Sequence, residues 1–303
     1  MKKDFLAITD WTKEQILDTL ELASELKEKQ KNGVPHAHLS GKNMAMIFQK
    51  PSSRTRMSFQ IGMYQLGGQV VYLGPQDIGL GKREAISDVA QTLSRYIDII
   101  MARLFGHEDV LELAHSASVP VINGLTDLLH PCQVMADMQT IFEHKGRRED
   151  LKIAWIGDGN NVANSWLNIA ARYPMYLALA VPQGYEPDAQ ILEGARAKGL
   201  SQIDVVNDAE TAARDADVIY SDVWASMGQE EEALTRQQAF KNFQVNEALM
   251  KLAAHDCVFM HCLPAHRGEE VTAGVIDGPQ SIVFDEAENR LHTQKAIMVK
   301  LFE

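Results

Sequence analysis

The chain has 303 residues, of which 46% are hydrophobic and 23% are charged, and its 41 acidic and 29 basic residues give a net charge of −12. These proportions are typical of a soluble globular protein and exclude a disordered chain, a collagen and a coiled coil. The negative charge argues against general nucleic-acid binding. No apolar run approaches the ~20 residues that a membrane helix needs, and the length predicts one large or two medium domains.

The cysteines and the first residues bear on where the protein works. Cys132, Cys257 and Cys262 are too few for a disulfide framework and lack paired zinc-ligand spacing. The first residues lead into no apolar stretch of the kind found in signal peptides, so we expect no secretory signal. We therefore expect a cytoplasmic protein without a metal.

The first predicted element is a helix that begins after Thr12, where Gln15 completes a capping box and apolar residues then recur at helical spacing as far as Leu26. Strand-like and helix-like patterns alternate after it. In this first series we expect strands over 44–48, 70–73, 97–103 and 120–123, and helices over 55–66, 83–95, 108–115 and 132–144.

A second series follows the stretch 145–150. Here we expect strands over 152–156, 177–181, 204–206, 218–221, 258–260 and 282–284, with helices between them and a last helix over 286–301. Alternating strands and helices predict an α/β fold in which each of two domains is a parallel sheet flanked by helices. We place the first domain at 1–145 and the second at 146–286.

In such sheets, ligands bind at the carboxyl ends of strands, so polar loops that follow strands are the candidate sites. The first is Ser52-Ser53-Arg54-Thr55-Arg56, which places three hydroxyls and two guanidinium groups at an expected helix N-terminus. Backbone N–H groups and arginine favour a phosphate or carboxylate there. The alternative is plain N-capping by Ser52 or Ser53 with solvated arginines. The glycine-rich Walker pattern is absent.

The second candidate loop is His130-Pro131-Cys132-Gln133. His130 offers a donor that could polarise a carbonyl oxygen, and Gln133 offers an amide. Alternatively, His130 only precedes a helix whose first residue is Pro131.

The third loop, 157–165, superficially resembles a dinucleotide-binding loop, but Val162 occupies the last glycine position, which disfavours NAD. The fourth region is split between Asp222 and the loop that begins at His261. Asp222 offers a carboxylate for an ammonium group, and Cys262 a thiol beside it if the fold brings the two loops together. Cys257 is interpreted as a buried small residue.

In chain order, these segments resemble the aspartate/ornithine carbamoyltransferase family, and within it the enzymes that act on ornithine. The matching segments are Ser52-Ser53-Arg54-Thr55-Arg56, His130-Pro131-Cys132-Gln133, Asp222 with Ser226-Met227-Gly228, His261-Cys262-Leu263-Pro264 and Glu288-Asn289-Arg290. The resemblance covers essentially the whole chain. It implies transfer of the carbamoyl group of carbamoyl phosphate to the δ-amino group of L-ornithine, giving citrulline and phosphate without a cofactor.

The resemblance also implies an architecture and residue roles. The first domain would bind carbamoyl phosphate, the second would bind ornithine, the last helix (287–303) would return to the first domain, and the chain would form a homotrimer. Carbamoyl phosphate would be bound by Ser52, Ser53, Arg54, Thr55, Arg103, His130, Gln133, Cys262, Leu263 and Arg290. Ornithine would be bound by Asn161, Asp222, Ser226 and Met227. The catalytic residues would be Arg54, Thr55, Arg103, His130 and Cys262.

Two positions depart from the family pattern. Ser53 stands where the family usually has threonine, so the hydroxyl is kept. Gly79 stands where the family usually has a glutamine or histidine that reaches into the site of the neighbouring subunit. Either Gln76 or Lys82 replaces that side chain here, or the contact is missing.

Several alternative functions stay open from the sequence. An aspartate enzyme would need cationic groups near Ser226-Met227-Gly228, and none is present. The other alternative functions are a putrescine or other amine carbamoyltransferase, a non-catalytic amino-acid or anion-binding protein, and a nucleotide-dependent dehydrogenase. We favour arginine biosynthesis over citrulline breakdown, which would use the same site.

Overall fold

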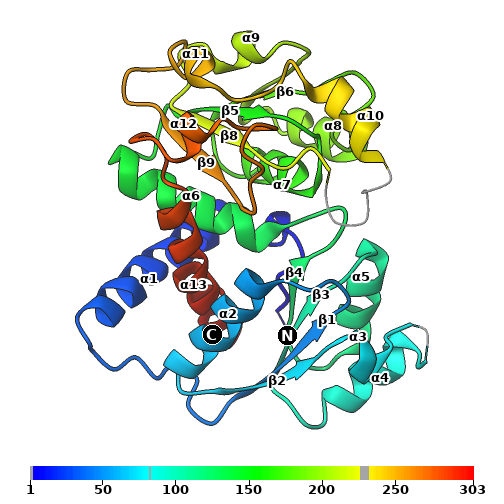
Figure 1. Ribbon diagram of the computed structural model, residues 1–303. Coiled ribbons are helices and arrows are strands. Elements are labelled where there is room, and N and C mark those ends of the chain that lie inside the picture. The colour runs from blue at the N-terminus through cyan, green and yellow to red at the C-terminus, as the bar shows by residue number, and fades with distance from the viewer. Residues whose placement is uncertain (1–2, 82, 226–231) are drawn as a thin grey trace. The chain divides into compact units, whose positions relative to one another are not determined.

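A computed structural model describes residues 3–81, 83–225 and 232–303 (Figure 1). The chain divides into two compact units, the first formed by Met1–Gln139 with Glu288–Glu303 and the second by Thr140–Ala287. Each unit contains one parallel sheet with helices packed on it, which confirms the predicted α/β fold class. None of the described helices is long and apolar enough to cross a membrane.

The sheet of the first unit has the strand order β2-β1-β3-β4, with every neighbouring pair parallel. Its strands are β1 (Asn43–Phe48), β2 (Gln69–Leu73), β3 (Ile99–Arg103) and β4 (Val121–Leu125). β3 is fully buried because it lies between two other strands and under helices. The register pairs Phe48 with Arg103, so the loop after β1 starts beside the last residue of β3.

The helices of the first unit follow the strands in the predicted order. They are α1 (Lys13–Lys31), α2 (Ser53–Gln65), α3 (Pro75–Ile78), α4 (Ile86–Leu93) and α5 (His107–Ser116), and α6 (Pro131–Lys145) begins in this unit. The Thr12–Gln15 capping box is present at the start of α1. The helix predicted over 83–95 is shorter than expected, and the segment before it contains the short α3.

The sheet of the second unit has the order β7-β6-β5-β8-β9. Its strands are β5 (Lys152–Ile156), β6 (Tyr176–Ala180), β7 (Gln202–Val206), β8 (Val218–Ser221) and β9 (Val258–His261). The chain runs outward from β5 in both directions, and such a reversal of strand order opens a crevice at the carboxyl ends of the strands. The register pairs Ile156 with Ser221 and Ser221 with His261, so the loops that follow these strands start side by side.

The remaining helices complete the second unit and the end of the chain. They are α7 (Asn161–Ala170), α8 (Ala189–Ala197), α9 (Ala209–Ala213), α10 (Ala233–Phe240), α11 (Glu247–Met250), α12 (Ala273–Ile276) and α13 (Val283–Lys300). The last part of α13 belongs to the first unit, where Lys27 Nζ donates to Asn289 Oδ1 at 2.8 Å. The predicted return of the last helix to the first domain is therefore confirmed.

The strand predicted over 282–284 is wrong. Val283 begins α13, and only Ser281 forms an isolated bridge to β9. Ile282 and Val283 are buried whereas Phe284 is 73% exposed, a pattern that suits the first turn of a helix. A short apolar run fits a buried strand and a buried helix start equally well, so periodicity could not separate them.

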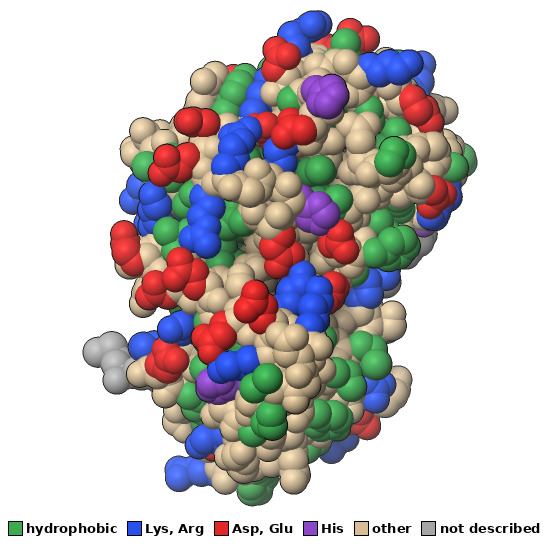
Figure 2. Space-filling model, turned by 90° about the vertical axis from the view of Figure 1, so that its left-hand side faces the viewer, with side chains coloured by type: hydrophobic (Ala, Val, Ile, Leu, Met, Phe, Trp, Pro, Cys, Tyr) green, Lys and Arg blue, Asp and Glu red, His purple; other side chains and the backbone are tan. Residues whose placement is uncertain are grey.

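Charged side chains are mixed on the molecular surface. On the face in Figure 2, acidic and basic side chains are interspersed, so there the net charge of −12 is not gathered into one acidic field.

Candidate active site

The N-terminus of α2 is the first part of the site. Ser52 has extended backbone and caps the helix, its hydroxyl accepting from the Thr55 N–H at 3.3 Å. Ser53 is exposed and Arg54 is half-buried. The guanidinium of Arg56 lies 4.1 Å from the centre of the Tyr72 ring, so it is engaged with an aromatic face. The capping interpretation is correct for Ser52, and it leaves Arg54 and Ser53 at a helix N-terminus, where an anion is favoured.

Thr55 is the residue on which this part of the site converges. It is fully buried, and its Oγ1 accepts from Arg290 Nη2 at 2.8 Å and from Arg103 Nη1 at 3.4 Å. The hydroxyl oxygen of Ser52 lies 3.1 Å from the same atom. Arg103 ends β3 and Arg290 comes from α13, so three distant segments meet at one hydroxyl.

His130 is buried next to these arginines. Burial, reinforced by the positive charges of Arg290, Arg103 and Arg54, holds the pKa of His130 well below its ordinary value. The imidazole is therefore neutral at physiological pH and can donate one hydrogen bond without carrying a charge. Three guanidinium groups around a neutral histidine are suited to a dianion that carries a carbonyl group.

Gln133 and Cys132 follow His130 on the first turn of α6. Gln133 is buried, and its Nε2 donates to Asp137 Oδ1 at 2.9 Å, which orients the amide. The Cys132 thiol donates to Asn123 O at 3.4 Å, and burial raises its pKa to about 12. Cys132 is therefore a packing residue.

The loop after β2 carries Gly79, the second of the two positions that depart from the family pattern. Gly79 caps the C-terminus of α3 with a φ of +55°, a left-handed conformation that favours glycine. A Cβ there would also meet the Arg83 Cβ at 3.0 Å. Gln76 is exposed, and Lys82 lies outside the described residues.

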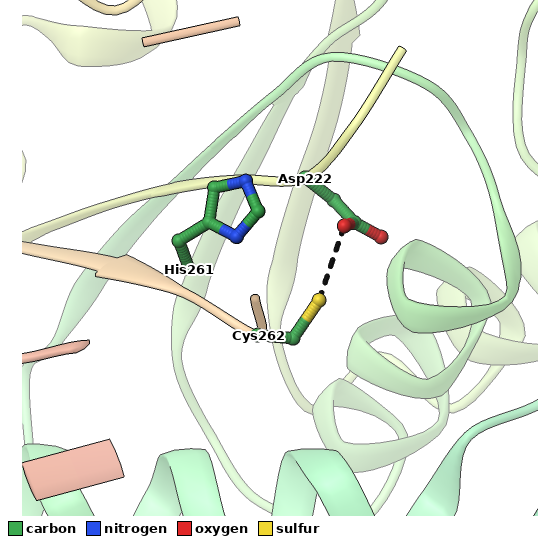
Figure 3. Close-up of side chains that lie close together, drawn as sticks. All are labelled: Asp222, His261 and Cys262. Atoms are coloured by element: carbon green, nitrogen blue, oxygen red, sulfur yellow. Dashed lines mark hydrogen bonds between the residues drawn. The ribbon is translucent and has the colours of Figure 1, made fainter. Parts of the chain in front are cut away.

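A separate cluster of polar side chains lies in the second unit, at the ends of β8 and β9. Asp222 Oδ1 accepts from the Cys262 thiol at 3.1 Å (Figure 3). The same oxygen accepts from the Val223 N–H at 2.8 Å. Asp222 is almost fully buried, and Cys262 is half-buried. The fold thus brings the two predicted loops together, which was the condition for a carboxylate–thiol pair.

Asn160 is a member of this cluster that the sequence reasoning missed. Its Nδ2 donates to Asp222 Oδ2 at 2.8 Å, while its Oδ1 caps α7 by accepting from the Val162 and Ala163 N–H groups at 2.9 and 3.2 Å. The predicted Asn161 is the next residue and begins α7. The usable signal was an N-cap asparagine after β5 together with the knowledge that β5 pairs with β8.

Gly159 in the loop after β5 has a packing reason that does not involve a nucleotide. A Cβ on Gly159 would come within 2.3 Å of Pro187 N, so only glycine fits there. A nucleotide is not needed to explain the loop.

Arg236 links the loop that follows β5 to the residues that follow β8. On α10, its Nη1 donates to Asp158 Oδ2 at 2.9 Å and to Trp224 O at 3.0 Å. Burial raises the pKa of Asp158 to about 6, although Arg236 acts in the opposite direction. The predicted Ser226 and Met227 lie outside the described residues.

Two groups of side chains within the described ranges have donor atoms close enough to hold a metal ion, all within 4.8 Å of one another. They are Asp222 with His261 and Cys262, and His266 with Glu269 and Glu270. In the first group the donor atoms are already hydrogen bonded, Cys262 to Asp222 and the His261 ring to Leu263 and Glu270. These bonds account for their proximity without an ion.

The fold and the two clusters together define the class of protein. It is a two-unit α/β protein with an arginine-rich, dianion-suited cluster in the first unit and a buried carboxylate beside a thiol in the second.

The comparisons with known proteins make the assignment specific. The family model described as "Aspartate/ornithine carbamoyltransferase, carbamoyl-P binding domain" matches residues 3–143, and the model described as "Aspartate/ornithine carbamoyltransferase, Asp/Orn binding domain" matches residues 149–301. The chain belongs to the aspartate/ornithine carbamoyltransferase family.

Individual relatives match over nearly the full length. The ornithine carbamoyltransferase of Geobacter metallireducens is 52% identical over 303 residues, which cover 100% of each chain. The structure of ornithine carbamoyltransferase from Pyrococcus furiosus has a TM-score of 0.94 at 51% identity, covering 98% of this chain and 96% of its own. The anabolic ornithine carbamoyltransferase from Campylobacter jejuni also gives a TM-score of 0.94, at 38% identity and 99% coverage of both chains.

Proposed function

We propose that this protein transfers the carbamoyl group of carbamoyl phosphate to the δ-amino group of L-ornithine, producing L-citrulline and phosphate. Membership in the carbamoyltransferase family and full-length similarity to relatives named ornithine carbamoyltransferase support this reaction. The observation that carries the proposal is the convergence of Arg103 and Arg290 on the buried Thr55 hydroxyl, beside neutral His130.

Carbamoyl phosphate is assigned to the first unit. Its phosphate is bound by the hydroxyls and backbone N–H groups at the start of α2 and by guanidinium groups, which match phosphate oxygens in a bidentate manner. The residues assigned to this ligand are Ser52, Ser53, Arg54, Thr55, Arg103, His130, Gln133 and Arg290, with Cys262 and Leu263 from the second unit.

The chemical step needs stabilisation of a carbonyl oxygen that becomes negative. The amine attacks the carbonyl carbon, a C–N bond forms, and the C–O bond to phosphate then breaks. Thr55, Arg103 and His130 donate hydrogen bonds to the developing oxyanion, and each such donor is worth roughly 3–4 kcal/mol. Arg54 and Arg290 stabilise the leaving phosphate, which accepts the proton that the amine releases.

Ornithine is assigned to the second unit. Asp222 pairs with its α-ammonium group, and Asn161, Ser226 and Met227 contact the same end of the molecule. Cys262 lies beside the δ-amine, where desolvation lowers the pKa of that amine and so supplies the neutral nucleophile. Buried Asp222 accepts from Asn160, Val223 and Cys262, and these donors hold its carboxylate in one orientation.

The wider setting is part of the proposal. We assign carbamoyl phosphate to residues 1–145 with 287–303 and ornithine to residues 146–286. We further assign the enzyme to a homotrimer in the cytoplasm and to arginine biosynthesis, in line with the anabolic relative described above.

The proposal is tested by initial rates of carbamoyl transfer with ornithine, putrescine, aspartate and acetylornithine side by side. We expect citrulline and phosphate in equal amounts from ornithine, and rates at least about 100-fold lower for the others, since each lacks or blocks a group that the site contacts. Faster turnover of putrescine would reassign the enzyme to amines. Saturable ligand binding without phosphate release would make it a binding protein.

A further inference from the structure

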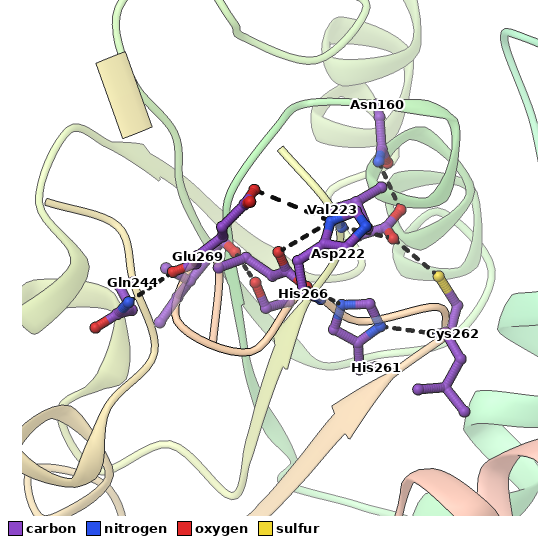
Figure 4. A network of polar contacts seen from close by, with 12 residues as sticks. Asn160, Asp222, Val223, Gln244, His261, Cys262, His266 and Glu269 are labelled. Atoms are coloured by element: carbon purple, nitrogen blue, oxygen red, sulfur yellow. Dashed lines mark hydrogen bonds and ion pairs between the residues drawn. The ribbon is translucent and has the colours of Figure 1, made fainter. Parts of the chain in front are cut away.

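The side chain of His261 is enclosed in a network behind the carboxylate–thiol pair (Figure 4). It ends β9 and is completely buried. Its Nδ1 lies 2.9 Å from the main-chain nitrogen of Leu263, and its Nε2 lies 3.2 Å from Glu270 Oε1. Both ring nitrogens are thus engaged, one by the turn that carries Cys262 and one by a buried carboxylate.

This arrangement determines the tautomer of the ring. The main-chain N–H of Leu263 can only donate, so Nδ1 must accept and the ring proton must reside on Nε2. Nε2–H then donates to Glu270, which is also completely buried and whose Oε1 accepts a second hydrogen bond from the His266 N–H at 2.6 Å. Glu270 therefore orients the imidazole.

The backbone of His261 is held as firmly as its ring. Its N–H donates to Glu286 Oε2 at 2.9 Å, and Glu286 Oε1 accepts from the Tyr220 hydroxyl at 2.9 Å. Glu286 and Tyr220 are buried, so this anchor is shielded from water. These hydrogen bonds hold the main chain of His261, from which the imidazole ring extends, in one position.

The turn that the ring supports has an unusual backbone. Leu263 has a φ of +58°, in the left-handed region that is unfavourable for a residue other than glycine. The hydrogen bond from the Leu263 N–H to Nδ1 helps to hold this conformation. Cys262 lies between the two bonded residues, and its thiol reaches Asp222 from there.

We propose that His261 is a positioning residue. Its Nδ1, oriented by Glu270, holds the Leu263 N–H and so fixes the turn that presents Cys262 and Leu263 to the substrates. This inference rests on the roles given to Cys262 and Leu263 under the proposed function. A proton-carrying role is a different hypothesis, since it would require the ring to leave one of its two bonds in every cycle.

The first test compares two amides at position 261. His261→Asn places an amide oxygen where Nδ1 accepts from Leu263, whereas His261→Gln places its amide near Nε2 and leaves the Leu263 N–H without an acceptor. Because a displacement of ~1 Å can cost about 100-fold in rate, we expect kcat to fall about 100-fold in His261→Gln and less than about tenfold in His261→Asn. Equal losses, or losses that follow the unfolding temperatures of the two variants, would overturn the positioning role.

The second test changes Glu270, the carboxylate that orients the imidazole. It does not require the variants at position 261 to fold. Glu270→Gln retains an oxygen that accepts from His261 but cannot take up a proton, so we expect less than about a tenfold loss of kcat. A folded Glu270→Gln enzyme that loses about 100-fold or more contradicts the proposal and favours proton transfer. Glu269→Gln is the matched control, because this substitution removes the same charge from the preceding residue, and Glu269 is exposed.

Cys262→Ala in the same series separates this inference from the assignment on which it rests. Unchanged turnover in Cys262→Ala removes the proposed role of Cys262, whatever the position 261 variants show. Slowed turnover in Cys262→Ala with equal losses in the two position 261 variants removes only the positioning role.

Discussion

The polar cluster of the first unit and that of the second unit use charge in opposite ways. In the first unit, Arg54, Arg103 and Arg290 surround a histidine that they help to keep neutral. In the second unit, one buried carboxylate, Asp222, is held by neutral donors: an amide, a main-chain N–H and a thiol. The first arrangement is suited to a dianion and to negative charge that develops during reaction, and the second to a single cationic group on an amino acid. If the proposed assignments hold, we expect binding of the carbamoyl donor to depend on several cationic groups and recognition of the amino acid on the single carboxylate of Asp222.

The largest expected effect comes from breaking the cationic half. Arg54→Gly should lower kcat/KM for carbamoyl phosphate at least about 1,000-fold, since it removes a charged donor from the phosphate. Arg56→Gln is the comparison, because the Arg56 guanidinium stacks on Tyr72 and we expect it to keep most activity. Steady-state rates and circular dichroism on both variants check this, and near-normal turnover of a folded Arg54→Gly enzyme would refute the phosphate assignment.

A smaller and more selective effect is expected in the acceptor half. Asp222→Ala should raise the KM for ornithine about 10- to 100-fold, which corresponds to a charged hydrogen bond of roughly 1.5–3 kcal/mol, and change the KM for carbamoyl phosphate much less. Initial rates with each substrate varied in turn measure the two constants. Equal changes in both would count against the pairing of Asp222 with the α-ammonium group.

The thiol should matter less than the carboxylate that it contacts. Cys262→Ala should slow turnover about tenfold without abolishing it, because the role proposed for Cys262 is to position and desolvate the amine. Cys132→Ala is a control at a thiol whose pKa burial raises to about 12, and we expect normal rates from it. Mass spectrometry of the quenched wild-type enzyme tests the alternative. A trapped carbamoyl-cysteine at position 262 would mean covalent catalysis and would contradict the positioning role.

The last prediction concerns a buried cation outside both clusters and affects stability only. Lys295 on α13 is fully buried, its Nζ lies 3.3 Å from His36 Nε2, and burial lowers its pKa to about 8. Since the unfolded chain then binds more protons between about pH 8 and 10.5, stability rises with pH across that window and the charged lysine costs most below it.

We therefore expect Lys295→Met to raise the free energy of unfolding by about 1–3 kcal/mol at pH 7, with a gain that shrinks towards pH 10. Denaturant titrations at both pH values measure it, and Lys31→Met is the exposed control. A loss of stability at pH 7 would show that the hydrogen bond to His36 outweighs the cost of burial.

Structural features were predicted correctly where the residues that determine them are close together in the sequence. Local periodicity placed β5 and β8 at their observed positions, and the capping box at Thr12 was found because all of its members lie within four residues. The strand expected over 282–284 failed because a short apolar run carries no information about which neighbour buries it.

The site was predictable where a motif is continuous and less so where it depends on register. Ser52 and Thr55 are three residues apart, and their contact follows from helix geometry. The donation from Asn160 to Asp222 depends on β5 lying beside β8, and the orientation of His261 by Glu270 depends on a turn between them. The grouping of Arg103 and Arg290 with Thr55 around one ligand was predicted only through family resemblance, and their hydrogen bonds to the Thr55 hydroxyl were not predicted.

The central claim is that the start of α2, with Arg103 and Arg290, holds the carbamoyl donor. A crystal structure of the enzyme with ornithine and a phosphonate analogue of carbamoyl phosphate tests it most directly. We predict phosphonate oxygens within hydrogen-bonding distance of Ser52 and Arg54, and the carbonyl oxygen of the analogue within reach of Thr55, Arg103 and His130. A fully occupied analogue bound elsewhere, with this corner empty, would contradict the account.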